Sequence, residues 1–202
     1  MKKQILVIHG GETFDTYEEY FSFLKNLEID FERIRLREKG WKKTLGEKLG
    51  ENFEVILPEM PNALNAKHAE WKIMLDKFIP FLNNNVILIG HSLGGIFLAK
   101  YLSENNFPKK IAATFLISAP FGDKNAEPTL GDFAFNGDLA KLQEQGGRIF
   151  LCYSKDDLCV PLADLEKYKQ ELLKAETMIF EDRGHFNQPE FPELVEKLKN
   201  IF

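Results

Sequence analysis

Two kinds of apolar pattern alternate along this chain. Short, largely apolar runs have the length of buried strands and lie at residues 5–8, 53–57, 86–89, 112–117, 149–153 and 177–180. Stretches in which apolar residues recur every three or four positions predict helices, among them 41–49, 66–81, 96–102 and 189–201. Strands that alternate with helices along the whole chain predict the α/β class, with a mostly parallel central sheet covered by helices on both faces.

The segment Gly90-His91-Ser92-Leu93-Gly94 lies between the strand predicted at 86–89 and the helix that follows it. A G-x-S-x-G pattern in this position is typical of the turn that presents a nucleophilic serine. Glycines two positions to either side leave room for so tight a turn. Ser92 is therefore the predicted nucleophile, and the alternative is an ordinary glycine-rich turn with a bystander serine.

A serine hydroxyl needs a base to remove its proton, and His185 is the histidine best placed for that role. It lies in a loop between the strand predicted at 177–180 and the final helix. His9 lies in a glycine turn, His91 lies inside the serine turn, and His68 falls on the polar side of the helical pattern 66–81. A surface histidine without a role is the alternative interpretation of His185.

The orienting carboxylate is predicted at Asp157, in the loop after the strand at 149–153. The chain order is then Ser92, Asp157, His185, the order that an α/β-hydrolase requires. Its neighbour Asp156 is interpreted as a solvated residue or a loop cap. Asp123, after the preceding strand, is a third candidate for the acid.

Two backbone N–H groups are expected to bind the oxyanion that forms when a carbonyl is attacked. One is that of Leu93, directly after the nucleophile, and the other comes from the glycine turn after the first strand, where Gly11 is preferred and Glu12 is the replacement. The same turn does not match a phosphate-binding loop, because it lacks the required glycine spacing and lysine.

These segments together resemble the small, cap-poor serine hydrolases of the α/β-hydrolase superfamily, in particular the retinoblastoma-binding protein nine family and its bacterial relatives. The resemblance runs through residues 5–11, 61–71, the turn around Ser92, the Asp-Asp-x-x-Val-Pro segment and Gly184-His185-Phe186. It implies an α/β-hydrolase fold with a minimal cap and the three triad roles for Ser92, Asp157 and His185. It does not imply a substrate.

An insertion at about residues 13–40 separates the first two strands by more than the usual few residues. Thr16 and Glu19 predict a capping box, followed by a helix with an aromatic face and a basic stretch that contains Arg33, Arg35, Arg37 and Lys39. The insertion leaves from the predicted oxyanion loop, so we expect it to lie beside the active site and shape the substrate pocket. The alternative is an aromatic helix that packs on the core edge.

The segment 119–147 is too short for a large cap, so an open or lightly covered site is expected. Candidate substrate contacts are Glu12, His91, Phe121, Phe133 and Phe135. For Phe133 and Phe135, packing in the core is an equal alternative.

Composition narrows the functional classes. The 202 residues fit one domain spanning 1–202, and a formal net charge of −5 disfavours nucleic acid as a partner, despite the basic stretch. The apolar run near the N-terminus is too short for a signal peptide, and no run could span a membrane, so a cytoplasmic protein is expected. Its two cysteines are expected to be reduced thiols, with Cys152 buried and Cys159 accessible.

The predicted function is that of a carboxylesterase-like serine hydrolase that cleaves an ester or thioester of a small acyl substrate through an acyl-enzyme. No cofactor is implied, and no metal site is expected, because no His or Cys pairs stand at ligand spacing. The alternative is a catalytically weak protein of the same fold that binds a protein partner. Acyltransferase and peptidase activities on the same residues also stay open.

Overall fold

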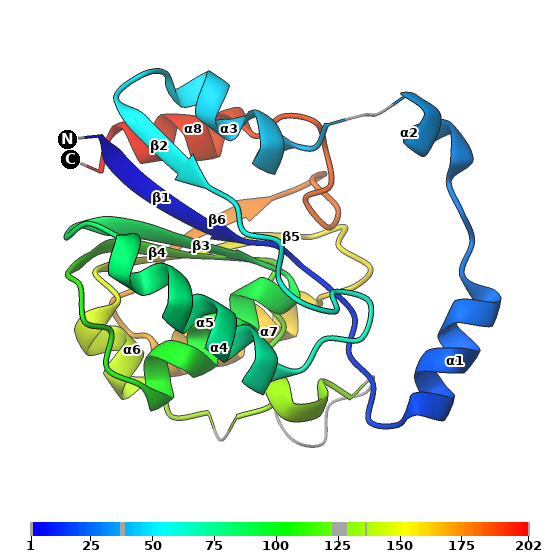
Figure 1. Cartoon of the computed structure of the whole chain (residues 1–202). Helices are drawn as coiled ribbons and strands as arrows, with labels where there is room; N and C mark the ends of the chain where they lie inside the picture. The colour runs from blue at the N-terminus through cyan, green and yellow to red at the C-terminus, as the bar shows by residue number, and fades with distance from the viewer. Residues whose placement is uncertain (1, 37–38, 123–128, 136, 202) are drawn as a thin grey trace.

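A six-stranded parallel sheet forms the centre of this computed structural model, which describes residues 2–36, 39–122, 129–135 and 137–201 (Figure 1). Its strand order is β2-β1-β3-β4-β5-β6, and every neighbouring pair is parallel. The strands are β1 (Lys3–Ile8), β2 (Phe53–Ile56), β3 (Val86–His91), β4 (Ile111–Ile117), β5 (Arg148–Ser154) and β6 (Glu176–Phe180). The mostly parallel sheet predicted from the apolar runs is confirmed.

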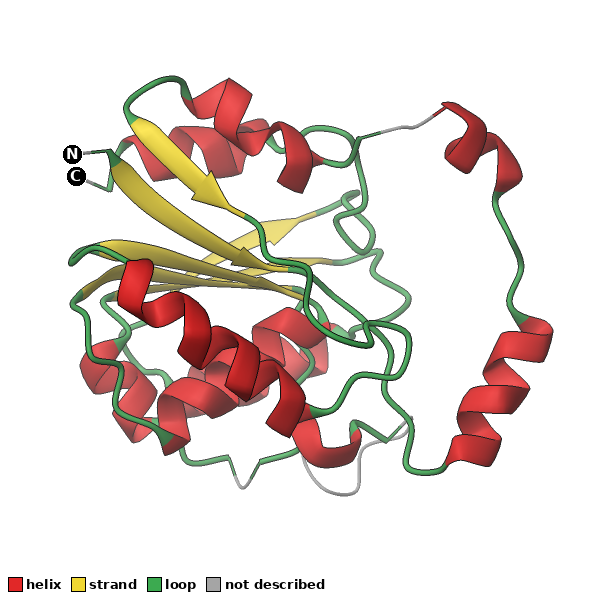
Figure 2. Cartoon of the chain, viewed as in Figure 1, coloured by secondary structure: helices red, strands yellow, loops and turns green. Residues whose placement is uncertain are grey.

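Helices cover both faces of this sheet (Figure 2). One face carries α3 (Trp41–Leu49) and α8 (Pro192–Lys199), and the other carries α4 (His68–Phe78), α5 (Leu93–Glu104), α6 (Ala140–Gln145) and α7 (Leu162–Glu171). Because β1 and β3 are buried from both sides, their residues form continuous apolar runs without alternation. Among the residues described between β4 and β5, helical structure is limited to α6 and the 3₁₀ turn η2 (Gly131–Phe133), in keeping with a minimal cap.

The interpretation of His68 as a residue on a polar helix face is wrong. It is the first residue of α4, its side chain is 7% exposed, and its ring packs against the rings of Phe97 and Phe133 at centroid distances of 5.4 and 5.6 Å. The helical periodicity missed this because η2, a distant segment, covers that side of α4. Burial, reinforced by Lys100, lowers the pKa of His68 to about 4, so the ring is neutral at pH 7.

The insertion forms two helices, α1 (Tyr17–Asn26) and α2 (Phe31–Leu36), which we call the arm (residues 16–36). The predicted capping box is present, since Thr16 Oγ1 accepts from the Glu19 N–H and the Glu19 carboxylate accepts from the Thr16 N–H. No residue of α1 is buried, and Tyr17 and Phe31 are 67% and 66% exposed. The arm therefore does not pack on the core edge.

Figure 1 shows where the arm lies instead: α1 and α2 stand apart from the sheet, on the side toward which the strands point. The carboxyl ends of the strands and the loops that follow them are on this side. Arg37 lies outside the described residues. Across the part of the chain that the structure describes, no helix is both long and apolar enough to cross a bilayer.

Candidate active site

The candidate site forms where the chain reverses its direction of travel across the sheet. From β1 the chain moves outward to β2 and then crosses back over β1 to β3, so that β1 and β3 are neighbours with helices leaving on opposite sides. Such a reversal opens a crevice at the carboxyl ends of the two strands, where α/β proteins bind ligands. Here β1 leads into His9-Gly10-Gly11, and β3 leads into Ser92.

Ser92 occupies a strained turn between β3 and α5. Its backbone angles are φ 55° and ψ −124°, a conformation that costs a non-glycine residue about 1–3 kcal/mol. The turn also requires its glycines: a Cβ on Gly90 would lie 2.3 Å from the Gly94 carbonyl oxygen, and one on Gly94 would lie 2.4 Å from the Ile8 carbonyl oxygen. The G-x-S-x-G spacing thus reflects close backbone approaches around a half-buried serine.

The two predicted oxyanion donors are backbone amides that no other described residue uses. Leu93 is the first residue of α5, and neither its amide nor that of Gly11 donates a hydrogen bond to another described residue. The amide of Glu12, the replacement donor, is already used, because it donates to the Ala63 carbonyl oxygen at 2.8 Å. A Cβ on Gly11 would lie 2.5 Å from that same oxygen, so this position requires glycine.

His9 braces the glycine turn, a role that the sequence did not suggest. Its Nδ1 donates to the Gly10 carbonyl oxygen at 2.6 Å, and its Nε2 accepts from the Met60 N–H at 2.9 Å. The turn passes close to Ser92, since a Cβ on Gly10 would lie 3.1 Å from Ser92 Cβ. Both ring nitrogens of His9 are therefore occupied by a structural task.

Asp157 is held at the carboxyl end of β5 by a full set of donors. Its side chain is completely buried and accepts from the hydroxyl of Ser118 at 2.5 Å and from the amides of Cys159 and Val160 at 2.8 and 3.1 Å. Burial alone would raise the pKa of Asp157, but the hydrogen bonds from His185, Ser118 and these amides outweigh it and lower the pKa. The carboxyl group is therefore ionised at neutral pH.

His185 meets this carboxylate from the loop after β6. Its Nδ1 lies 3.0 and 3.1 Å from the two carboxylate oxygens of Asp157. The neighbouring Asp156 faces outward and caps the same loop, accepting from the Gly184 N–H at 2.8 Å. The third candidate acid, Asp123, lies outside the described residues.

Two buried rings hold the backbone carbonyls of His185 and of the residue after it. His91, which is 3% exposed, donates from Nε2 to the carbonyl oxygen of His185 at 2.8 Å, and the indole N–H of Trp41 donates to the carbonyl oxygen of Phe186 at 2.8 Å. His91 therefore supports the loop from inside the protein, where it is not open to substrate. Neither support was found from the sequence, because each joins residues about 100 positions apart or more.

Among the described residues, no hydrogen bond joins the Ser92 hydroxyl to the His185 ring. That ring lies beside the ring of His91, the residue before Ser92, at a centroid distance of 5.1 Å. In unliganded enzymes, catalytic hydrogen bonds are often long and tighten when substrate binds.

Glu12 and Cys159 reach the surroundings of His185 from two different loops. Partial burial raises the pKa of the Glu12 carboxyl, and attraction to His185 opposes this rise, which places the two groups near each other. Cys159 is exposed and Cys152 is buried, as predicted from the sequence. Of the candidate substrate contacts, Glu12 is exposed, whereas His91 is buried.

The three candidate phenylalanines pack against other aromatic side chains. Phe133 is completely buried in the core against Trp71 and Phe97, and Phe135 is buried against Phe121. Phe121 is half-buried and packs edge-on to Tyr168. The structure places Phe133 and Phe135 in the packing role that the sequence left open.

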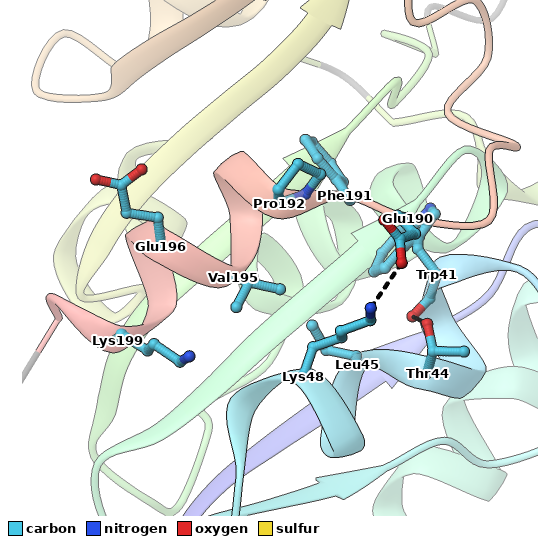
Figure 3. A pocket seen from close by; sticks show the side chains of 10 residues that line it. All are labelled: Trp41, Thr44, Leu45, Lys48, Glu190, Phe191, Pro192, Val195, Glu196 and Lys199. Atoms are coloured by element: carbon cyan, nitrogen blue, oxygen red, sulfur yellow. Dashed lines mark hydrogen bonds and ion pairs between the residues drawn. The ribbon is translucent and has the colours of Figure 1, made fainter.

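A groove of about 350 Å³ lies between α3 and α8 (Figure 3). It is mainly apolar, with an ion pair between Lys48 and Glu190 at 2.6 Å. Trp41 lines this groove, and the same side chain holds the carbonyl of Phe186, the residue after His185. None of the predicted catalytic residues lines it.

Comparison with known proteins points in one direction. A family model described as "Serine hydrolase" matches residues 36–197. Serine hydrolase RBBP9 of Rattus norvegicus is 27% identical over 165 residues, which cover 80% of this chain and 84% of the relative. The putative hydrolase YdeN of Bacillus subtilis is 26% identical over 198 residues, covering 94% of this chain and 89% of the relative.

Solved structures give the same fold. The ydeN gene product of B. subtilis superposes with a TM-score of 0.72 at 21% identity, covering 100% of this chain and 99% of that one. A meta-cleavage product hydrolase from Pseudomonas fluorescens superposes with a TM-score of 0.66 at 12% identity, covering 99% and 90%. These neighbours confirm the predicted α/β-hydrolase fold.

Proposed function

Because the chain belongs to the serine hydrolase family, as a small hydrolase of the type that includes RBBP9 and YdeN, we propose that it cleaves a carboxylic ester or thioester of a small substrate through an acyl-enzyme on Ser92. The observation that carries this proposal is the hydrogen-bonded pair of Asp157 and His185, with its carboxylate completely buried. This pair of residues lies at the same edge of the sheet as the strained turn of Ser92.

In the proposed mechanism, Ser92 attacks the acyl carbonyl while His185 takes the hydroxyl proton and then returns it to the leaving group. Water, activated by the same imidazole, hydrolyses the acyl-enzyme. The ionised Asp157 accepts from Nδ1, and this keeps the lone pair of the neutral imidazole on Nε2. Closing the serine–histidine hydrogen bond is assigned to substrate binding.

The amides of Leu93 and Gly11 are the proposed oxyanion donors. Both are unused by other described residues, and the competing amide of Glu12 is engaged with Ala63. One such donor typically contributes a factor of about 10²–10³ to turnover. Because each is a backbone group, its position is set by the glycine turn and by the start of α5 rather than by a side chain.

The substrate side of the site is assigned to the arm. We propose that the chain acts as one catalytic domain and that α1 and α2 form a wall against which the acyl group packs. Support comes from the exposed aromatic side chains of α1 and α2 and from their position on the side toward which the strands point. An apolar group bound there would be shielded from water by the aromatic side chains of the arm.

A fluorophosphonate probe tests the nucleophile, and p-nitrophenyl esters of graded chain length test the reaction. We expect labelling and hydrolysis by the wild-type protein, and neither by Ser92→Ala. His185→Ala should lose labelling while keeping its fold, as judged by circular dichroism. Labelling that persists in Ser92→Ala would contradict the proposed nucleophile.

The same probe separates hydrolysis from the alternative of a protein-binding module of the same fold. The exposed arm is the feature that favours this alternative, since exposed aromatic residues are common at protein interfaces. A correctly folded wild-type protein that neither labels nor hydrolyses any ester of the series would favour it.

A further inference from the structure

The loop that supplies Asp157 also carries Cys159, and the two side chains converge on His185. A carboxylate oxygen of Asp157, the sulfur of Cys159 and a ring nitrogen of His185 all lie within 4.8 Å of one another. The thiol is exposed, while the carboxylate is buried and the imidazole is half-buried. An ion could therefore reach the three donors from solvent along the cysteine side.

The charges around this cluster favour a cation. The carboxylate of Asp157 is completely buried beside the His185 imidazole. Glu12 stands in the loop after β1, at the same sheet edge, and adds a second negative charge. Negative charge at this edge favours a bound divalent ion.

We propose that Asp157, Cys159 and His185 bind a Zn²⁺ ion, and that this ion inhibits the hydrolase by occupying its base. The inhibition rests on the proposed function, whereas the binding does not. A set of one sulfur, one imidazole nitrogen and one carboxylate oxygen suits Zn²⁺ among common ions, because Mg²⁺ and Ca²⁺ prefer oxygen alone. The spacing of these residues in the sequence does not predict a metal site, because His185 lies in a different loop from Asp157 and Cys159.

The geometry requires only a small adjustment. Tetrahedral zinc separates its nitrogen, oxygen and sulfur donors by about 3.3–3.6 Å. The imidazole nitrogen and the nearer carboxylate oxygen are already 3.0 Å apart. Rotation of the exposed Cys159 side chain can bring its sulfur the remaining distance, and water can complete the coordination.

Metal binding releases one proton to solvent and moves another within the imidazole. Zn²⁺ binds the sulfur as a thiolate, and the thiol proton passes to solvent. Ligation of Nδ1 displaces the proton that this nitrogen shares with Asp157, and the proton moves to Nε2. The imidazole stays neutral, but its free lone pair is gone, so it can no longer accept the proton of Ser92.

Binding is tested with Co²⁺, which reports a thiolate ligand through a near-ultraviolet charge-transfer band. We expect the band in the wild-type protein and in Ser92→Ala, and its loss in Cys159→Ala. Cys152→Ala is the matched control, because it removes the other, buried thiol and should keep the band. Absence of the band from the folded wild-type protein, or its persistence in Cys159→Ala, would overturn the site.

Inhibition is tested by titrating Zn²⁺ into the ester assay. The Cys159→Ala variant should hydrolyse esters at the wild-type rate without metal, and should require about 10–100 times more Zn²⁺ for half-inhibition. A chelator should restore the wild-type rate. Equal zinc sensitivity in the two proteins would refute the inhibition, whereas a cobalt band in a protein without esterase activity would sustain the metal site and refute the proposed function.

Discussion

The sheet with its site loops and the arm are held in opposite ways. The backbone carbonyls of His185 and Phe186 are each bound by a buried ring, and the imidazole of His185 is bound by a buried carboxylate. In the arm, α1 has no buried side chain, and its best-defined interaction is its own capping box. The residues of the site are fixed by packing, whereas those of the arm are constrained only locally.

The two regions meet at well-anchored points. Before the arm, the hydroxyl of Thr13 donates to the carbonyl oxygen of Ala66 at 3.0 Å, and after it Trp41 bonds to Phe186. The arm is thus a loop of chain between two fixed ends. The contrast teaches that the sheet and its site loops can keep their geometry while the arm changes.

The largest effect is expected from Asp157→Asn. Asparagine can still accept from the amides of Cys159 and Val160, but it no longer favours the correct His185 tautomer, so kcat should fall about 10⁴-fold with the fold retained. Asp156→Asn is the matched control, since this exposed neighbour only caps the loop, and it should lose less than about tenfold. Similar losses in steady-state assays of both variants would argue against the assignment of the acid.

The next effect is structural. A methyl group on Gly94 would lie within 2.5 Å of two backbone oxygens, so Gly94→Ala should lower the free energy of unfolding by about 3 kcal/mol or more. Gly46→Ala, within α3, is the control: its Cβ meets nothing closer than 3.7 Å, and the change should raise stability by up to about 1 kcal/mol. Urea unfolding measures both, and a tolerated Gly94→Ala would show that the turn is not tightly packed.

Acid should lower the free energy of unfolding through the protonation of His68. Its pKa in the folded protein is about 4, below the ordinary value of 6.5, so the unfolded chain binds a proton that the folded chain does not. Stability linked to this group is complete above pH 6.5 and is lost as pH falls toward 4, about 2 kcal/mol by pH 5. In His68→Phe this part of the slope should vanish, while the contribution of His91 remains in both proteins. Parallel curves of unfolding free energy against pH would exclude His68 as the cause.

The smallest effect on the fold is expected from removing the arm. With residues 16–38 replaced by a short Gly/Ser linker, unfolding free energy should change by less than about 0.5 kcal/mol, since no α1 side chain is buried. In contrast, kcat/KM for long-chain esters should fall about tenfold relative to short-chain esters. An unchanged chain-length profile would remove the arm from the substrate site, and a large loss of stability would break the comparison itself.

The fold could be predicted because its signals are local. Apolar runs mark the strands, and the glycines around Ser92 stand where backbones nearly touch, so both leave a trace within a few residues. The positions of Asp157 and His185 after the last strands could be predicted for the same reason. Whether these side chains perform the chemistry is a separate matter that the labelling and kinetic experiments address.

The remaining features depend on partners far away in the chain. The apolar periodicity of residues 66–81 puts His68 on the polar side of its helix, yet Phe133 from another segment covers it. The aromatic face of α1 has the pattern of a packed helix, yet none of its residues is buried, and its ring contacts outside the helix are with Phe14. Hydrophobic periodicity shows which face could be buried, not whether a partner is there to bury it.

The bond between Trp41 and Phe186 has a consequence for biosynthesis. It joins residues 145 positions apart, so the acceptor is synthesised long after the donor. The early strands can assemble while the loop after β6 is still being made, yet His185, the proposed base, has no fixed place until that loop docks against α3. Chains that stop before this loop can therefore be globular without holding the proposed base in position.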